Sequence, residues 1–329
     1  MQLAHQGRLA DQQEDDGCTP FASIVICTRN RSKYLEKCLP SLAGLDYPNY
    51  EIVVVDGSTS HDQRLRNQKI AYDIDARYIF ERRKGKSLAQ NIGIAAAKGD
   101  IIVTTDDDCI PERSWLRLLT QNFTDPSVMC AAGRTKSLFS NELSQLFEEL
   151  AAFDRGAQRR VFNKKSISLW SQSPRMLSRI FSKQLNEITP APWGVGYGNN
   201  IAYRRTVFYE VGFFDERLGP GTSSAGSEDT DFVYRILKAG YKAVYDPRAL
   251  IFHQHRDSLP ALEQTCHSYG LAQRSFLLKY IRNDPYALFC YIGGIAHLCL
   301  VILGHRFKRK GFLPYLTALE LCGWLNLRW

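Results

Sequence analysis

The sequence predicts an α/β protein whose mixed, mostly parallel sheet is flanked by helices and followed by an apolar helical appendage. Between residues 21 and 128, short β-branched segments alternate with segments of helical spacing, and the connections between them are short. This alternation is typical of parallel strands that are covered by helices on both faces. The 329 residues suffice for one α/β domain of roughly 250 residues and an appendage.

The first predicted strands run into polar residues. Residues 21–27 form a strand that ends at the polar segment 28–31, and a helix follows. A second strand, residues 50–55, ends at Asp56 and a turn rich in glycine and serine, and residues 77–80 form a weaker third strand. Because parallel sheets bind ligands at the carboxyl ends of their strands, we expect a binding crevice at this edge.

The next elements lead to an acidic run. Residues 87–97 predict a helix that Gly99 ends, and residues 100–104 predict a buried strand. A further helix is expected over residues 111–123, with Pro111 near its first turn.

Three successive aspartates, Asp106, Asp107 and Asp108, follow the buried strand. Such carboxylates repel one another unless a cation or hydrogen-bond donors neutralise them. Because strand side chains alternate, we expect Asp106 and Asp108 to face the same side and share a cation. Hard oxygen ligands suit Mg²⁺ or Mn²⁺, which commonly accompany a substrate's phosphates. The alternative is an acidic turn that caps a helix.

The middle of the chain is less regular. Residues 154–184 carry eight basic residues and one aspartate, which form either a solvated face or a surface for anionic lipid headgroups. Residues 192–200 form a glycine-rich loop before a strand at residues 201–203. This loop is not a dinucleotide fingerprint, because no strand precedes it and Asn199 stands in the third glycine's place.

A second acidic motif opens a helix that ends near Gly240. Ser227 can cap this helix, and Glu228 and Asp229 lie in its first turn, where acids complement the helix dipole. Pure capping is the alternative to a chemical role. The helix is followed by two expected strands, residues 241–245 and 250–252.

Two histidines follow the second of these strands. Alternation places His253 and His255 on the same side of the chain. A lone histidine is more often structural, but two of them in a protein that already needs a metal favour His253 as a ligand.

Together these motifs resemble family 2 glycosyltransferases of the GT-A fold over residues 21–256. The resemblance rests on six motifs in order: residues 26–31, 54–58, 86–93, the three aspartates with Pro111, residues 198–200, and Glu228 with Asp229. Each motif alone is weak, and their order makes the match specific. It implies a Rossmann-like GT-A domain with a nucleotide-sugar half (21–130) and an acceptor and catalytic half (131–256).

The resemblance also implies roles for individual residues. The nucleotide-sugar would be bound by Thr28, Arg29, Asp56, Lys86, Asn91, Asp106 and Asp107. Metal ligands would be Asp106, Asp108 and His253. Asp229 would be the catalytic base assisted by Glu228, with Asp231 as the rival base, and Trp193, Asn199 and Asn200 would shape the acceptor loop. The implied reaction is an inverting, Mg²⁺- or Mn²⁺-dependent transfer from a nucleotide-diphospho-sugar.

Composition and the N-terminal segment indicate the compartment. The nine cysteines are scattered without a CxxC pair, which fits reduced thiols in a cytosolic protein. Residues 1–20 are polar and lack the apolar core of a signal peptide, so we expect a disordered tail. The net charge of +8 favours an anionic partner. The basic residues match no recognised nucleic-acid-binding module, so we expect no nucleic acid partner.

The C-terminal region, residues 257–329, is expected to be helical and membrane-associated. Residues 286–303 carry no formal charge and just reach the length of a bilayer span, and a basic cluster follows at 305–310. A span would place this cluster outside a cytosolic enzyme, against the positive-inside tendency. We therefore expect helices in the cytosolic leaflet, with a single span or a buried helical hairpin as alternatives.

The sequence thus predicts a glycosyltransferase that uses a lipid-linked or polysaccharide acceptor at the cytosolic face of a membrane. A nucleotidyltransferase is one alternative, but it would normally carry a glycine-rich basic loop where this chain has residues 28–31. A catalytically inactive, membrane-associated sugar-binding scaffold is the other. All the expected acids are present, which argues against an inactive relative.

Overall fold

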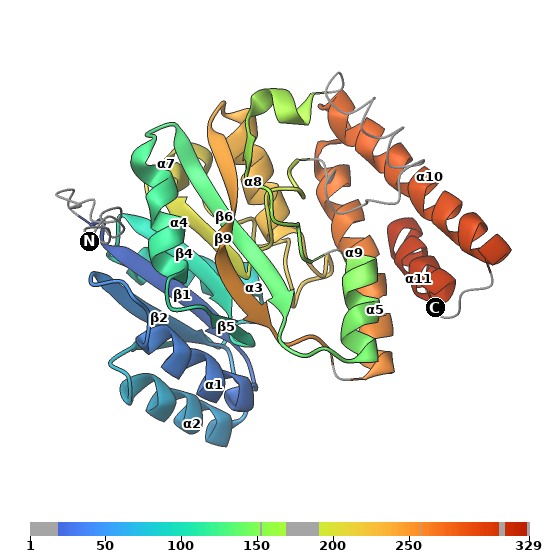
Figure 1. Cartoon of the computed structure of the whole chain (residues 1–329). Helices are drawn as coiled ribbons and strands as arrows, with labels where there is room; N and C mark the ends of the chain where they lie inside the picture. Colours follow the sequence, from blue (N-terminus) through green and yellow to red (C-terminus); the bar gives the residue numbers. More distant parts are fainter. Residues whose placement is uncertain (1–18, 152, 169–190, 257, 309–312, 328–329) are drawn as a thin grey trace, which may run out of the picture.

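The computed structural model describes residues 19–151, 153–168, 191–256, 258–308 and 313–327, and shows a twisted central sheet flanked by helices (Figure 1). The strands are β1 (Ala22–Thr28), β2 (Tyr50–Asp56), β3 (Arg77–Phe80), β4 (Ile101–Asp106), β5 (Cys109–Pro111), β6 (Val128–Ser137), β7 (Arg160–Phe162), β8 (Asn200–Arg204) and β9 (Lys242–His253). The helices are α1 (Ser32–Ala43), α2 (His61–Tyr72), α3 (Lys86–Ala96), α4 (Trp115–Thr120), α5 (Glu142–Ala151), α7 (Val207–Val211), α8 (Glu228–Lys238), α9 (Leu259–Tyr280), α10 (Pro285–Lys308) and α11 (Leu313–Leu325), with 3₁₀ turns η1 (Gln121–Thr124) and η2 (Lys164–Ile167).

In the described part of the chain the sheet has nine strands in the order β3-β2-β1-β4-β8-β6-β9-β5, with β7 paired to β9. Strands β1 to β4 are mutually parallel, and β6 and β9 run the same way, whereas β5, β7 and β8 run in the opposite direction. The predicted mixed, mostly parallel sheet is therefore confirmed.

The strand register brings the polar strand ends together. Thr28 pairs with Asp56 across β1 and β2, and Cys27 pairs with Asp106 across β1 and β4. The antiparallel strand β8 begins at the same edge, because Asn200 pairs with Thr105. Polar residues that are far apart in sequence thus meet at one edge of the sheet.

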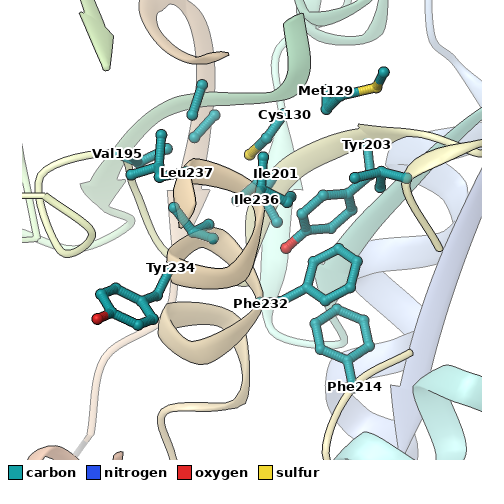
Figure 2. Close-up of a cluster of buried hydrophobic side chains, with 14 of the residues drawn as sticks. Met129, Cys130, Val195, Ile201, Tyr203, Phe214, Phe232, Tyr234, Ile236 and Leu237 are labelled. Atoms are coloured by element: carbon teal, nitrogen blue, oxygen red, sulfur yellow. The ribbon is translucent and has the colours of Figure 1, made fainter. Parts of the chain in front are cut away.

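Apolar clusters on the two faces of the sheet form the core. One cluster joins β1, β2 and β4 to α1 and α4, and includes the fully buried Leu35 and Trp115. The other gathers around β8 and α8 (Figure 2), where the rings of Tyr203 and Phe232 lie 5.0 Å apart in an edge-to-face contact. Close packing on this face holds α8, which carries the second acidic motif, firmly against the sheet.

Several predicted elements differ in detail. Pro111 is the last residue of β5, and α4 begins only at Trp115, because pairing of Pro111 with Ile251 of β9 outweighs the local helix signal. The two strands predicted before His253 are one strand, β9, in which residues 247–249 bulge out of the pairing with β6. The helix predicted from residue 87 is confirmed as α3.

Helices α9, α10 and α11 lie together at one side of the sheet (Figure 1). Side chains Leu316, Leu319 and Trp324 of α11 are buried, so the C-terminal helices pack on one another. Within the described ranges, no helix combines the length and apolarity needed to cross a membrane. The predicted N-terminal tail up to residue 18 and the part of the basic segment from 169 to 184 lie outside the described residues.

Candidate active site

The three aspartates at the end of β4 separate into two groups, Asp106 on one side and Asp107 with Asp108 on the other. The Asp106 carboxylate pairs with the ammonium group of Lys86 on α3. Asp107 accepts a hydrogen bond of 2.7 Å from the Thr28 hydroxyl. The Arg31 guanidinium bridges Asp107, at 3.1 Å from Nε to Oδ1, and Asp108. Cationic and hydroxyl donors therefore neutralise much of the repulsion expected from the acidic run.

Burial shapes the electrostatics of this group. Asp107 and Asp108 are only 3% and 7% exposed. For Asp107, burial outweighs the attraction of Arg31 and raises the pKa of the carboxyl to about 7. For Asp108, burial also raises the pKa, but His253 and Arg31 together hold it well below its usual range. Asp108 is thus the member of the pair that is held as a carboxylate.

Asp108 and His253 form a candidate metal centre. The Asp108 Oδ1 atom lies 3.3 Å from His253 Nε2, and the Cys109 thiol completes a group whose ligand atoms are all within 4.8 Å of one another. Antiparallel pairing of Cys109 with His253 across β5 and β9 brings these residues together. Cys109 was not predicted, although its position directly after Asp108 was a signal.

Asp106 does not belong to this group in the described part of the chain. Strand β4 ends at Asp106, and a turn separates it from β5, so the side-chain alternation that predicted a cation shared by Asp106 and Asp108 does not extend this far. The expectation that Asp106 is a metal ligand remains a prediction, and the structure turns its carboxylate to Lys86.

Lys86 links the two acidic motifs. Its ammonium lies 3.8 Å from a Glu228 carboxylate oxygen and also pairs with Asp106. Burial disfavours the charge on Lys86, but Asp106 and Glu228 outweigh burial and raise its pKa. Burial and the neighbouring Asp229 raise the pKa of Glu228 to about 7. The first turn of α8 is therefore held beside the end of β4.

Asp229 is the partly exposed acid of this turn. Its Oδ2 atom accepts a hydrogen bond of 2.7 Å from the Gly198 backbone N–H, and its Oδ1 atom accepts one of 2.7 Å from the Thr230 backbone. A side chain on Gly198 would place a Cβ 3.1 Å from Asp229 Oδ2, so glycine permits this close approach. Asp229 can thus face a bound substrate from a fixed position.

Ser227 does not cap α8 as predicted. It occupies the N-cap position, but its backbone is left-handed, with φ of 67°, and its side chain makes no capping hydrogen bond. A capping serine normally has an extended backbone, which directs its hydroxyl toward the N–H groups of the first turn.

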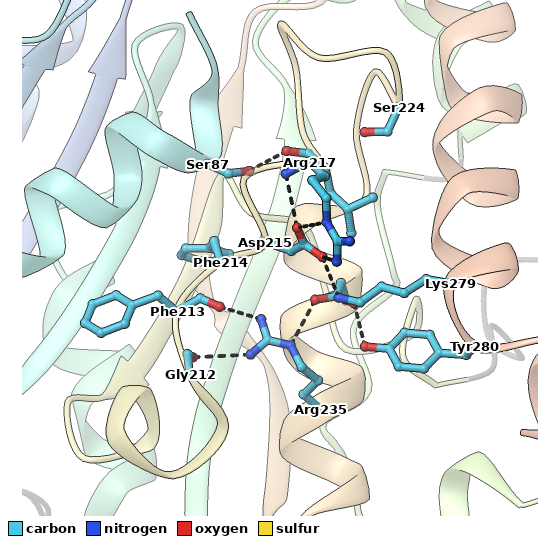
Figure 3. A network of polar contacts seen from close by, with 12 residues as sticks. Ser87, Gly212, Phe213, Phe214, Asp215, Arg217, Ser224, Arg235, Lys279 and Tyr280 are labelled. Atoms are coloured by element: carbon cyan, nitrogen blue, oxygen red, sulfur yellow. Dashed lines mark hydrogen bonds and ion pairs between the residues drawn. The ribbon is translucent and has the colours of Figure 1, made fainter. Parts of the chain in front are cut away.

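The rival base, Asp231, has a supporting role. It is fully buried, and its carboxylate accepts hydrogen bonds from Arg235, Lys279 and Tyr280 at 2.9, 2.6 and 2.7 Å. Figure 3 shows this network, in which Arg235 also donates to backbone carbonyls of the 212–213 turn. An acid occupied in this way cannot accept a proton from a substrate without breaking the contacts that hold α8, α9 and this turn together.

The predicted nucleotide-binding residues lie at the expected edge of the sheet, but they differ in whether their side chains are free to contact a nucleotide. Asp56 is fully buried and accepts hydrogen bonds from the Ser58 backbone, Asn67 and Tyr78. The Asn91 amide is hydrogen-bonded to the backbone of Phe214 in both directions. Arg29, by contrast, is partly exposed, and no ion pair is found for it among the described residues.

The predicted acceptor loop is mainly buried. Asn200 is fully buried, and its amide accepts from the Trp115 indole at 2.8 Å and donates to the Arg134 carbonyl at 2.9 Å. Asn199 is 3% exposed and accepts from Thr135 at 3.3 Å. Trp193 packs edge-to-face on Phe276 of α9. These three side chains hold the loop in place around Gly198.

The family model of glycosyl transferase family 2 matches residues 23–212, more than half of the chain. The chain belongs to glycosyl transferase family 2. The matched range covers the strand ends and the three aspartates but stops before α8 and His253.

Two relatives illustrate the similarity. The chain is 29% identical over 237 residues to the pre-mycofactocin glycosyltransferase of Mycobacterium tuberculosis, covering 72% of this chain and 43% of the relative. It is 22% identical over 238 residues to the glucosyl-dolichyl phosphate glucuronosyltransferase of Haloferax volcanii, covering 70% of this chain and 68% of that relative. The chain thus spans less than half the length of the M. tuberculosis relative.

Solved structures show the same fold. A mannosyltransferase from Pyrobaculum calidifontis, in complex with GDP-Man and Mn²⁺, superposes with a TM-score of 0.61 at 16% identity, covering 94% of this chain and 87% of that one. S. aureus TarS with UDP-GlcNAc superposes with a TM-score of 0.56 at 17% identity, covering 93% and 79%. The fold is therefore of the GT-A type.

Proposed function

We propose that this protein is an inverting glycosyltransferase that moves a sugar from a nucleotide-diphospho-sugar to a hydroxyl of a lipid-linked or polysaccharide acceptor at the cytosolic face of a membrane. Membership of glycosyl transferase family 2 supports the reaction class. The two similar structures contain GDP-Man and UDP-GlcNAc, which supports a nucleotide-sugar donor.

The observation that carries the proposal is the position of Asp229. It is the partly exposed acid in the first turn of α8, whereas Glu228 is 4% exposed and Asp231 is fully buried. Lys86 ties this turn to Asp106, which lies two residues before Asp108 of the candidate metal centre. A partly exposed carboxylate held in this way can serve as the base that accepts the proton of an acceptor hydroxyl.

The donor set fits a divalent cation. Asp108 supplies a carboxylate and His253 an imidazole, ligands that Mn²⁺ accepts, and the similar P. calidifontis structure contains Mn²⁺. A Mg²⁺ or Mn²⁺ ion bound there would neutralise the charge on the departing diphosphate. The imidazole nitrogen of His253 makes the set softer than an all-oxygen one, which favours Mn²⁺ over Mg²⁺.

The side chains then have distinct tasks. Asp229 removes the proton from the acceptor hydroxyl, whose oxygen forms a bond to the anomeric carbon while the bond to the diphosphate oxygen breaks. Attack from the face opposite the leaving group inverts the anomeric configuration. Arg29 and Lys86 supply positive charge toward the diphosphate, and Thr28 orients Asp107. Asp56 and Asn91 act by holding the loops that surround the donor.

The membrane part of the proposal rests on α10. Its exposed apolar side chains Leu288, Ile292 and Leu303 are 44%, 59% and 51% exposed. At 100° per residue these positions fall within about 60° of one another around the helix, so they form one apolar face. The H. volcanii relative has a dolichyl phosphate compound in its name, which supports a lipid-linked acceptor. We expect this face to rest in the cytosolic leaflet.

Asp229→Asn tests the reaction. The amide cannot accept the proton, so release of nucleoside diphosphate from the donor in the presence of a membrane extract should fall roughly a hundred- to ten-thousandfold. Donor binding, measured by thermal shift, should stay within about twofold of wild type, because Asn keeps the shape of the side chain. Asp75→Asn is the matched control, since Asp75 is exposed and precedes β3 at the opposite end of that strand.

The alternatives predict different results. A sugar-binding scaffold would show no turnover in wild type, in Asp229→Asn or in Asp75→Asn. A nucleotidyltransferase would release pyrophosphate from a nucleoside triphosphate rather than nucleoside diphosphate from a nucleotide-sugar. Either result would contradict the proposed reaction.

A further inference from the structure

A chain of three polar side chains runs from His253 into the protein. His253 Nδ1 lies 2.9 Å from His255 Nδ1. On the far side of the second ring, His255 Nε2 lies 2.9 Å from Glu148 Oε1 on α5. Neither His255 nor Glu148 touches the three aspartates, and the chain ends at the ring nitrogen that faces Asp108.

The hydrogen bonds of Glu148 determine which nitrogen of His255 carries a proton. The second carboxylate oxygen of Glu148, Oε2, accepts a hydrogen bond of 3.1 Å from the Asp154 backbone N–H. Glu148 is therefore held through both oxygens and acts as an acceptor toward His255. A carboxylate has no proton to donate, so His255 must carry a proton on Nε2.

If both histidine rings are neutral, only one placement of protons is compatible with the contact between His253 and His255. With its proton on Nε2, a neutral His255 presents a lone pair at Nδ1. The contact of 2.9 Å between the two Nδ1 atoms needs one proton, which His253 must supply from its own Nδ1. In the neutral ring, His253 Nε2 is left with a lone pair 3.3 Å from Asp108 Oδ1, where a bound cation would replace the proton that Nε2 otherwise donates to this carboxylate.

Aromatic packing keeps both rings from turning over. Phe153 stacks on His253, with centroids 5.3 Å apart and planes 6° from parallel. Phe147 packs on His255 with centroids 4.4 Å apart, and His255 is only 7% exposed. A ring flip that exchanged the two nitrogens would have to displace these contacts and break two hydrogen bonds.

We propose that Glu148 and His255 are positioning residues that hold the proton of His253 on Nδ1 and so keep Nε2 free as a metal ligand. This inference rests on the proposed function, because it takes His253 as a ligand of the divalent cation, and it adds the residues that support that ligand. Outer-shell partners of this kind fix the tautomer and orientation of a ligating imidazole and increase its basicity. Because α5 supplies Glu148, the C-terminal half of the domain takes part in building a site at the end of β4.

The test uses Glu148→Leu and His255→Phe in the full-length protein, with Glu142→Leu as control. Glu142 is exposed on the same helix, so the control repeats the glutamate substitution away from the site. The affinity for Mn²⁺ alone is measured by electron paramagnetic resonance. The proton positions on the histidine rings are measured by ¹⁵N NMR of the metal-free, ¹⁵N-histidine-labelled protein.

We expect both variants to bind Mn²⁺ roughly ten- to a hundredfold more weakly than wild type and the control to bind it equally well. In wild type, His253 should carry its proton on Nδ1, and Glu148→Leu should shift that proton between the two nitrogens. Rescue by Glu148→Gln, whose amide oxygen can still accept from His255, would distinguish proton positioning from simple loss of packing.

Two results would overturn the inference. One is a wild-type His253 whose Nδ1 carries no proton in the metal-free protein. The other is a Glu148→Leu variant that binds Mn²⁺ as tightly as Glu142→Leu. If wild type binds no Mn²⁺ at all, the proposed metal site fails, and the proton positions alone then decide whether Glu148 and His255 direct the tautomer.

Discussion

Exposure separates the roles of the acidic residues in the first turn of α8. Glu228 and Asp231 are buried and engaged with cationic side chains, whereas Asp229 is partly exposed and held by backbone N–H groups. The two backbone hydrogen bonds fix the position of the Asp229 carboxylate without tying it to another side chain. The same residue type therefore supports structure at one position and can perform chemistry two residues away.

Gly198→Ala tests how far the position of Asp229 matters. The added Cβ would lie 3.1 Å from Asp229 Oδ2, so the carboxylate must move by a few tenths of an ångström or lose its backbone donor. We expect turnover to fall roughly ten- to a hundredfold while donor affinity stays unchanged, because misplacing a catalytic group costs rate rather than binding. Steady-state kinetics of nucleoside diphosphate release would measure both quantities. Unchanged turnover would show that the hydrogen bond from Gly198 does not position the base.

Glu320 gives the C-terminal helices a pH dependence. Burial raises the pKa of this α11 side chain to about 7, and its Oε1 atom accepts a hydrogen bond of 3.2 Å from Gln273. Between the unfolded pKa of 4.5 and about 7, the folded protein holds a proton that the unfolded chain releases. The stabilising contribution is therefore complete below pH 4.5 and is lost as the pH rises through about 7.

Glu320→Gln should remove this dependence, because the amide is never charged. We expect it to match wild type near pH 5 and to be more stable at pH 8 by on the order of 1–3 kcal/mol, a rise of a few degrees in Tm. Thermal melts at the two pH values measure the difference, with Glu142→Gln, an exposed position, as control. An equal difference from wild type at both pH values would contradict the assignment to Glu320.

Among the elements, helices α9 and α11 cross at close range in the C-terminal region. A Cβ on Gly270 of α9 would lie 2.0 Å from the Glu320 carbonyl oxygen, and one on Gly323 of α11 would lie 2.2 Å from the His267 carbonyl oxygen. The two backbones thus touch through their glycines, and α9 in turn supplies Lys279 and Tyr280 to the Asp231 network. The packing of α11 is therefore connected, through α9, to the helix that carries Asp229.

Gly270→Leu should separate these helices. Overpacking at this contact is expected to lower the free energy of unfolding by about 2–3 kcal/mol or more, and to lower turnover through α8. Gln264→Leu is the control, because Gln264 is an exposed position on the same helix. Urea unfolding and kinetics of both variants check the prediction. Equal stability of the two variants would mean that the crossing is not tight.

At the scale of the whole molecule, the strand and helix order could be predicted because β-branched runs and helical spacing alternate in sequence. The insertion of the antiparallel strand β8 between β4 and β6 could not be predicted, because it depends on pairing between residues that are about 70 to 100 positions apart. Local pattern also failed at Pro111, where pairing with β9 decided the conformation.

The candidate site, like the fold, could be predicted only in part from the sequence. Polar residue types at strand ends predicted the correct edge of the sheet, but polarity alone does not tell a ligand contact from a supporting one. Asp56 and Asn200 illustrate this, since both are fully buried and hydrogen-bonded within the protein. Cys109 and Glu148 were missed because the pairing of Cys109 with His253 and the contact of Glu148 with His255 arise only in the folded chain. Telling a ligand-contacting residue from a supporting one requires knowing how deeply each side chain is buried, and a single sequence does not give this.

The central claim is that Asp108 and His253 hold a divalent cation that the nucleotide-sugar donor requires. The most direct measurement is the thermal shift of wild type and Asp108→Ala with a panel of UDP- and GDP-sugars, each with Mn²⁺ and with EDTA. We predict that one donor raises the Tm of wild type by several degrees with Mn²⁺, that EDTA removes the shift, and that Asp108→Ala shows none. A donor that stabilised both proteins equally, with or without Mn²⁺, would contradict the claim.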